Sequence, residues 1–314
     1  NGNYNIGTRK GYLYERSSID DSSYFFIADD MAIDDSLGLG EFRGNALYKS
    51  KDSLSFDLIA NNIKTNRKKD VLLATELPIL MIKQPNDTLY VSADTLYSGR
   101  LSDLTRKIPK ARAKEEQLKD SSLNKYFEAF HHVKIYSDSM QGVADSLFYS
   151  LADSTIRLHN KPILWVNENQ ITGDTIYMHL NNKKAEQLRI LNNAMAISPV
   201  DSTDYFNQLK GNSIIVDFMD GKIHKMQTKG SAENIYFTTD DEGKFIGVNQ
   251  SNAQIITIDF NNDEPVKIVF INQLTGKMTP MFDLPKSELK LNNFKWLIDL
   301  KPMSKFDILS PKAN

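Results

Sequence analysis

The stretch Gly173-Asp174-Thr175-Ile176-Tyr177-Met178-His179-Leu180 decides the fold of this protein. After a turn-forming Gly-Asp pair, one face carries Ile, Met and Leu, and the other face carries Thr, Tyr and His. Because successive side chains of an extended chain point to opposite faces, this alternation predicts a β-strand with one buried face. The same period recurs along most of the sequence, whereas helical periodicity is scarce, which predicts an all-β fold. Further strands contain Ile214, Val216 and Phe218, and Ile256, Ile258 and Phe260.

The beginning of this stretch is one copy of a repeat. In each copy a small residue and an Asp, or a polar substitute, precede an apolar strand. One or two further strands lie between copies, so each repeat predicts a rung of two or three short strands that stacks on its neighbours. The copies are Ala28-Asp29-Asp30-Met31-Ala32, Ala93-Asp94-Thr95-Leu96-Tyr97, Ala144-Asp145-Ser146-Leu147-Phe148, Gly173-Asp174-Thr175-Ile176-Tyr177, Gly211-Asn212-Ser213-Ile214-Ile215 and Ala253-Gln254-Ile255-Ile256-Thr257.

Stacked rungs change the domain organisation expected of a 314-residue chain. This length ordinarily suggests about two domains, but a solenoid lengthens its core rung by rung without thickening it. We therefore expect one elongated β-solenoid over residues 1–285 and a C-terminal cap and tail over residues 286–314. The segment Ser102–Lys125 is rich in charge and contains Pro109. It predicts a short irregular or helical insertion, with a bend or sub-domain break of the solenoid near residues 102–125.

Composition excludes several classes of protein. The 38 Lys and Arg nearly balance the 40 Asp and Glu, which argues against a nucleic-acid partner, since such proteins usually carry a strongly basic domain. The absence of Cys excludes disulfides and thiolate chemistry. No apolar run approaches the roughly 20 residues of a membrane-spanning helix. Because the chain starts at Asn1 rather than Met, we expect a processed or truncated product whose signal peptide has been removed.

The sequence contains no recognisable catalytic or metal-binding motif. Phosphate-binding, nucleophile-elbow and zinc-protease signatures are all absent. His131 and His132 would point to opposite faces of a strand and could not both bind one metal. The acidic pairs lack the ligand spacing of a calcium-binding helix-loop-helix motif. We therefore predict no enzyme activity, no cofactor and no metal. The acidic pairs are Asp20-Asp21, Asp29-Asp30, Asp34-Asp35 and Asp240-Asp241.

The run of rungs resembles the OstA/LptA-like family of lipopolysaccharide transport proteins. Besides the rungs, Gly44-Asn45-Ala46-Leu47 is similar to the turns of that family. The chain is most similar to the C-terminal half of the long OstA-like proteins of Bacteroidetes. The segments that carry this closer resemblance are Tyr205-Phe206-Asn207-Gln208-Leu209-Lys210-Gly211, Gly276-Lys277-Met278-Thr279-Pro280 and Leu291-Asn292-Asn293-Phe294-Lys295-Trp296.

The resemblance implies a fold, a location and a function. The fold would be an OstA-like β-jellyroll, a V-shaped β-solenoid of stacked short-strand rungs. The protein would be periplasmic and associated with the cell envelope, and would shield the acyl chains of lipopolysaccharide or lipid A. Its partners would be other OstA-like jellyroll proteins of a transport bridge, with head-to-tail self-association through open sheet edges. By their position in the rungs, the lipid-binding candidates are Leu96, Leu147, Ile176, Met178, Ile214, Val216, Phe218, Ile256 and Ile258.

Two other interpretations remain open at this point. The chain can be a structural, adhesin-like β-solenoid whose interior is packed with its own side chains. It can also be a carbohydrate-active β-solenoid enzyme, which would present carboxylates and aromatic rings on one outer face. An open slot lined by apolar side chains favours the lipid conduit, whereas a fully packed core favours the scaffold.

Overall fold

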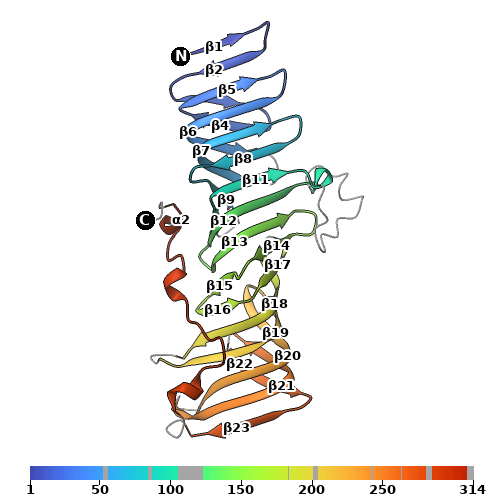
Figure 1. Ribbon diagram of the computed structural model, residues 1–314, viewed down its shortest axis with the longest axis vertical. Helices are drawn as coiled ribbons and strands as arrows, with labels where there is room; N and C mark the ends of the chain where they lie inside the picture. Colours follow the sequence, from blue (N-terminus) through green and yellow to red (C-terminus); the bar gives the residue numbers. More distant parts are fainter. Residues whose placement is uncertain are drawn as a thin grey trace. The chain divides into compact units, whose positions relative to one another are not determined.

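The computed structural model describes residues 1–51, 56–83, 87–104, 123–182, 184–200, 204–240, 242, 244–262, 264–280 and 285–309. The chain divides into two compact units, one of Asn1–Ile156 with Pro302–Asn314 and one of Arg157–Lys301. In these described residues both consist mainly of antiparallel strands, and the helical elements have three to five residues each (Figure 1). The predicted all-β fold of stacked short strands is thus confirmed. The centre of the predicted insertion, residues 105–122, lies outside the described residues, and the boundaries 1–285 and 286–314 stay a prediction.

In unit 1 the sheet folds into two walls. The longer strands run through both walls, and the shorter strands belong to one wall each. For example, the first half of β6 pairs with β5 and its second half pairs with β4. The elements are β1 (Gly2–Asn5), β2 (Lys10–Leu13), β3 (Ser17–Asp20), β4 (Tyr24–Ala28), β5 (Asp30–Asp34), β6 (Leu39–Ser50), β7 (Phe56–Asn66), β8 (Val71–Thr75), β9 (Ile79–Lys83), β10 (Thr88–Ser92), β11 (Thr95–Gly99), η1 (Leu101–Asp103), β12 (Tyr126–Tyr136), β13 (Met140–Ser150) and α2 (Lys305–Leu309).

Unit 2 has the same two-walled construction with longer strands. The halves of β18 pair with β17 and β16, and the halves of β21 pair with β22 and β23. The strand β14 (Thr155–His159) contains the sequence boundary between the units. The other elements are β15 (Ile163–Val166), β16 (Asn169–Thr172), β17 (Thr175–Asn181), β18 (Lys184–Pro199), β19 (Phe206–Met219), β20 (Lys222–Thr239), β21 (Phe245–Asn261), β22 (Glu264–Ile271), β23 (Thr275–Thr279), η3 (Lys286–Leu289) and η4 (Ile298–Leu300).

The repeated small-residue and Asp motif forms the corners between the walls. On β6, β12, β18 and β20 the bend lies at two consecutive residues with left-handed backbone, such as His131 (φ 59°) and His132 (φ 51°) of β12. The backbone N–H of Asp94, which begins the next short strand, donates to the carbonyls of Phe130 (3.2 Å) and His131 (3.0 Å). The bend takes these two carbonyls out of the hydrogen-bond ladder between the strands. The N–H of Asp94 therefore supplies their hydrogen-bond partner. Equivalent left-handed pairs are Gly44-Asn45, Asn192-Asn193 and Gly230-Ser231.

Small residues are required on the inside of these bends. A Cβ atom on Gly211 would lie 2.4 Å from Cγ2 of Thr228 on the neighbouring strand. A Cβ on Gly173 would lie equally close, 2.4 Å, to Cγ2 of Ile190. The small residue and the Asp of the motif thus have separate tasks, because the first makes room inside the corner and the second closes its hydrogen bonds.

The segment after β23 crosses one wall of unit 2. Register places Gln170, Ile197, Gln208, Ile235 and Gln250 in a single row across five neighbouring strands. All three glutamine amides of this row bond to the backbone of residues 288–297. On the same face, Leu289 packs against Ile235, Phe237 and Val248. These contacts hold the segment on the face opposite to Ala196 and Leu209.

Candidate functional site

Eight of the nine predicted lining residues are buried, and Phe218 is half-buried. The buried ones in unit 2 fall into two rows across adjacent strands. One row contains Ile176, Ile190, Ile214, Thr228 and Ile256, and the next contains Met178, Leu188, Val216, Met226 and Ile258. No side chain among the eight is more than 8% exposed. In this structure these residues pack against their own chain, and their contact with a lipid stays a prediction.

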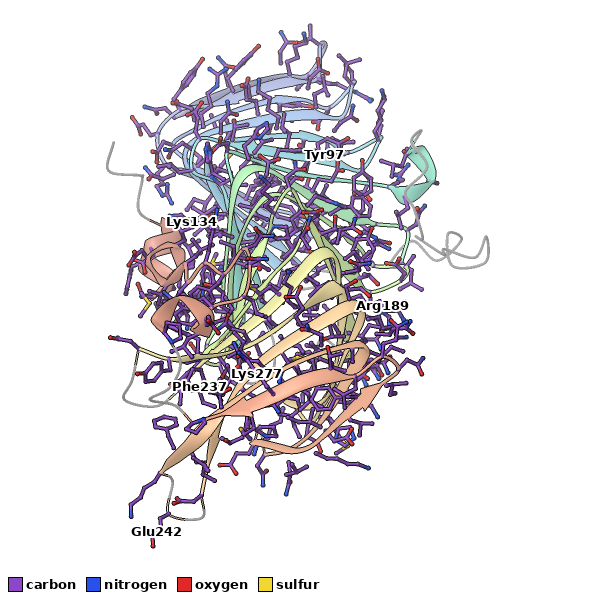
Figure 2. The ribbon with its side chains drawn as sticks, turned by 60° about the horizontal axis from the view of Figure 1, so that its bottom comes forward. Tyr97, Lys134, Arg189, Phe237, Glu242 and Lys277 are labelled. Carbon is purple, nitrogen blue, oxygen red and sulfur yellow. The ribbon has the colours of Figure 1, made fainter. Side chains whose placement is uncertain are left out.

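The opposite face of the same strands is solvated, as alternation requires. Arg189 lies between the buried Leu188 and Ile190 and is exposed at the surface (Figure 2). In unit 1, Leu96 and Leu147 share a row with Phe42 of β6. Phe42 lines an open cavity of about 290 Å³. None of the nine predicted residues lines this cavity.

One side of the cavity is formed by a single row of residues that are aligned across neighbouring strands. Register aligns Tyr4, Gly11, Ile33, Gly40, Thr65, Leu72 and Ser98 on consecutive strands of one wall. All but Gly11 line the cavity. A Cβ on Gly40 would lie 2.8 Å from both the ring of Phe42 and Oγ1 of Thr65. The lack of a side chain at Gly40 thus lets the Phe42 ring and the Thr65 side chain lie against the backbone at this side of the cavity.

Aromatic rings form much of the rest of the lining. Phe26 and Phe42 stack with their centroids 3.8 Å apart and their planes 4° apart. Tyr48 lies 4.9 Å from Phe26 and 5.4 Å from Phe56, again between centroids. Such a cluster offers a large apolar surface on rigid side chains. The aromatic residues of β4, β6 and β7 in the lining are Tyr24, Phe26, Phe42, Tyr48 and Phe56.

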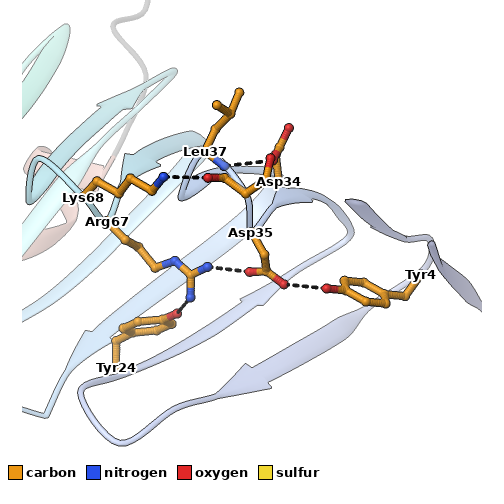
Figure 3. Close-up of polar contacts among 8 residues, drawn as sticks. Tyr4, Tyr24, Asp34, Asp35, Leu37, Arg67 and Lys68 are labelled. Atoms are coloured by element: carbon orange, nitrogen blue, oxygen red, sulfur yellow. Dashed lines mark hydrogen bonds and ion pairs between the residues drawn. The ribbon is translucent and has the colours of Figure 1, made fainter. Parts of the chain in front are cut away.

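Charged side chains at the cavity are paired with one another (Figure 3). Asp35 accepts hydrogen bonds from the hydroxyl of Tyr4 (3.0 Å) and from Arg67 (2.5 Å). Arg67 also donates to the hydroxyl of Tyr24 at 3.2 Å, and Lys125 lies 3.5 Å from Asp70. The hydrogen bond to Asp35 raises the pKa of the Tyr4 phenol. Since these cations already have carboxylate partners, the apolar lining is the main feature offered to a ligand.

Sequence reasoning missed this cavity. The available signal was the density of Phe and Tyr between residues 24 and 56. The corner at Gly44-Asn45 interrupts the alternation, so that Phe42 and Tyr48 belong to different walls although both line the cavity. The packing of the two walls against each other decides which aromatic rings face which small residues.

The histidines and acidic residues do not assemble into a metal site in the part of the chain that the structure describes. His131 and His132 were expected on opposite faces of a strand. Instead they occupy the left-handed corner and contact different carboxylates, Asp145 (3.2 Å) and Asp94 (2.8 Å). In the same described residues, no helix has the length and hydrophobicity needed to cross a membrane.

Comparison with solved structures finds LptH from Pseudomonas aeruginosa. It is described as the LptA homologous periplasmic component of the conserved lipopolysaccharide transport device. The sequences are 12% identical, the TM-score is 0.22, and the match covers 52% of this chain and 80% of that chain. No family model and no curated protein matches the sequence. The fold class therefore rests on the strands, walls and corners described above.

Proposed function

We propose that this protein binds lipid without chemical conversion and shields acyl chains of lipopolysaccharide, as a periplasmic component of an envelope bridge. The observation that carries the proposal is the open cavity of unit 1, lined by stacked aromatic rings and aliphatic side chains. An acyl chain gains about 0.8 kcal/mol for each methylene that leaves water. A cavity with this lining therefore favours a hydrocarbon chain over a charged metabolite.

The size of the cavity bears on how much lipid it accommodates. Ligand pockets usually measure about 300–1,000 Å³, so a cavity of about 290 Å³ is at the lower end. It has room for a segment of one chain rather than for a lipid with several chains. We expect further chains to enter the apolar rows that include Leu96, Ile176, Ile214 and Ile256, after these rows separate.

Exposed edge strands support the proposed assembly with like-folded partners. The four residues of β1 are exposed, and among the described strands β1 pairs with β2 alone. In unit 2, Val266 of β22 is 63% exposed and Met278 of β23 is 55% exposed. Exposed edges of this kind present unpaired backbone groups that can pair with another chain. Movement of lipid along such an assembly requires an energised partner, because a passive trough only equilibrates its ligand.

A structural scaffold is the second candidate function, and the packing of unit 2 favours it. Ile176, Ile214, Val216 and Ile256 are fully buried without any ligand. A scaffold needs a packed core of this kind, whereas a conduit needs space. The two functions therefore make opposite predictions for lipid contact at the cavity.

Photocrosslinking with purified lipopolysaccharide tests the proposal. A photoreactive phenylalanine analogue is placed at Tyr24 or Tyr48 in the cavity, and at the exposed Tyr12 of β2 as the matched aromatic control. We expect lipid adducts at Tyr24 and Tyr48 and none at Tyr12. Equal labelling at all three positions, or no labelling at any, would contradict the lipid-binding function. Probes at Ile176, Ile214 and Ile256, with Thr175 as their outward control, then show how far the lipid path extends.

A further inference from the structure

The hydroxyl group of Ser98 is the feature of the cavity that the apolar lining does not explain. Ser98 lies on β11, is 2% exposed, and is one of the residues that line the cavity. Its Oγ atom is buried and has no hydrogen-bond partner. An unsatisfied buried hydroxyl is unfavourable for the folded protein, because its hydration is lost without replacement.

Other polar groups of the cavity wall have partners within the protein. Asp35 accepts from Tyr4 and Arg67, and Asp70 pairs with Lys125. Asn66 accepts from the backbone N–H of Lys69. Of the described residues that line this cavity, Ser98 is the one whose buried polar atom lacks a partner.

The position of Ser98 in its row places this hydroxyl among apolar groups. Its neighbour in register is Leu72, and the adjacent position along β11 on the same face is Leu96. A ligand made only of methylene groups would leave Oγ unsatisfied. A ligand oxygen at this position would supply the missing hydrogen bond, because a serine hydroxyl both donates and accepts.

We propose that Ser98 is a selectivity-determining contact for an acyl chain that carries a hydroxyl or carbonyl oxygen. This inference rests on the proposed lipid-binding function and adds the chemical class of the preferred chain. The aromatic rings hold the hydrocarbon part, and the Ser98 hydroxyl distinguishes an oxygenated chain from a fully saturated one. A single additional hydrogen bond typically changes affinity by roughly threefold to tenfold.

The test compares stearic acid with 3-hydroxystearic, 10-hydroxystearic and 12-hydroxystearic acids. Their affinities for the full chain are measured by displacement of a fluorescent fatty acid below the concentration of micelle formation. We expect at least one hydroxylated acid to bind roughly threefold to tenfold more tightly than stearic acid. In Ser98→Ala this preference disappears.

The matched control is Ser150→Ala on β13. Ser150 is also fully buried, its Oγ also lacks a partner, and it does not line the cavity. We expect Ser150→Ala to keep the wild-type preference, and both variants to melt at or above the wild-type temperature, because each removes an unsatisfied hydroxyl.

The outcomes separate this inference from the function on which it rests. If stearic acid binds and all hydroxylated acids bind equally well, or if Ser98→Ala keeps the preference, the role of Ser98 is overturned and lipid binding stands. If no fatty acid binds the wild-type protein, the acyl-binding function of the cavity is itself contradicted, and the role of Ser98 is overturned with it.

Discussion

The side-chain oxygen of Gln208 accepts a hydrogen bond from the backbone N–H of Leu291 at 2.8 Å, across 83 residues of sequence. The amide of the same side chain donates to the carbonyl of Leu289 at 2.8 Å. Gln170 makes the equivalent pair of bonds with Leu297 and Lys295. These glutamines bind the backbone of the C-terminal segment in the way that a neighbouring strand would.

Replacing Gln208 with Leu should destabilise the protein by about 1–3 kcal/mol, because two backbone groups of the segment lose their buried partners. The free energy of unfolding in urea, followed by the fluorescence of Trp165 and of Trp296 in the segment, measures this loss. Gln227→Leu on β20 is the control, since Gln227 bonds to Thr257 rather than to the segment. Equal effects of the two substitutions would argue against a specific role for Gln208.

The corner at Gly211 should not tolerate a methyl group. Gly211→Ala places its Cβ 2.4 Å from Cγ2 of Thr228, and overpacking of this kind costs about 1–3 kcal/mol. Thr228→Ser removes that methyl group, so the double variant should recover part of the loss. A thermal-melting double-mutant cycle reports the coupling. Strictly additive effects would show that the contact between the new Cβ and Cγ2 of Thr228 is not what destabilises the Gly211→Ala variant.

The buried rows of unit 2 predict that two adjacent isoleucines of β19 contribute differently to the stability of the protein. Ile214 is fully buried, whereas Ile215 points to the opposite face and is half-buried. Ile214→Ala should cost about 2–5 kcal/mol, as expected for a cavity in a packed core. Ile215→Ala should cost clearly less in the same urea titration. Similar losses at both positions would contradict the assigned alternation.

Acid should weaken the first corner of unit 1 through Asp29. Hydrogen bonds from Asn45 (2.9 Å) and Arg16 (3.0 Å) lower the pKa of Asp29 below its usual 3.8. Because the folded pKa lies below the unfolded one, the stabilisation is present above the unfolded pKa and is lost as pH falls through the folded pKa. The melting temperature of Asp29→Asn should therefore fall less than that of the wild type below about pH 4. Parallel melting profiles for the two proteins would rule out this contribution.

Local features of the sequence were sufficient for the alternation of the strands and for one tight turn. The alternation in Thr175–Leu180 correctly predicts a strand with Ile176 and Met178 buried. The pair Asp220-Gly221 predicts the hairpin between β19 and β20, where both residues adopt left-handed backbone. Strand alternation and turn formation depend on side chains that are only a few positions apart in the chain. Both can therefore be predicted from the local sequence.

The sequence by itself thus determined an all-β chain of stacked rungs with a repeated motif of a small and a polar residue. Only the tertiary structure decided where the interior is open. Gly40 and Ser98 face the cavity from one wall, and Phe26 and Tyr48 face it from the other. The space between them reflects a mismatch in side-chain volume between two rows assembled from distant strands. Local periodicity shows which side chains point inward, but it does not show which of them meet across the interior.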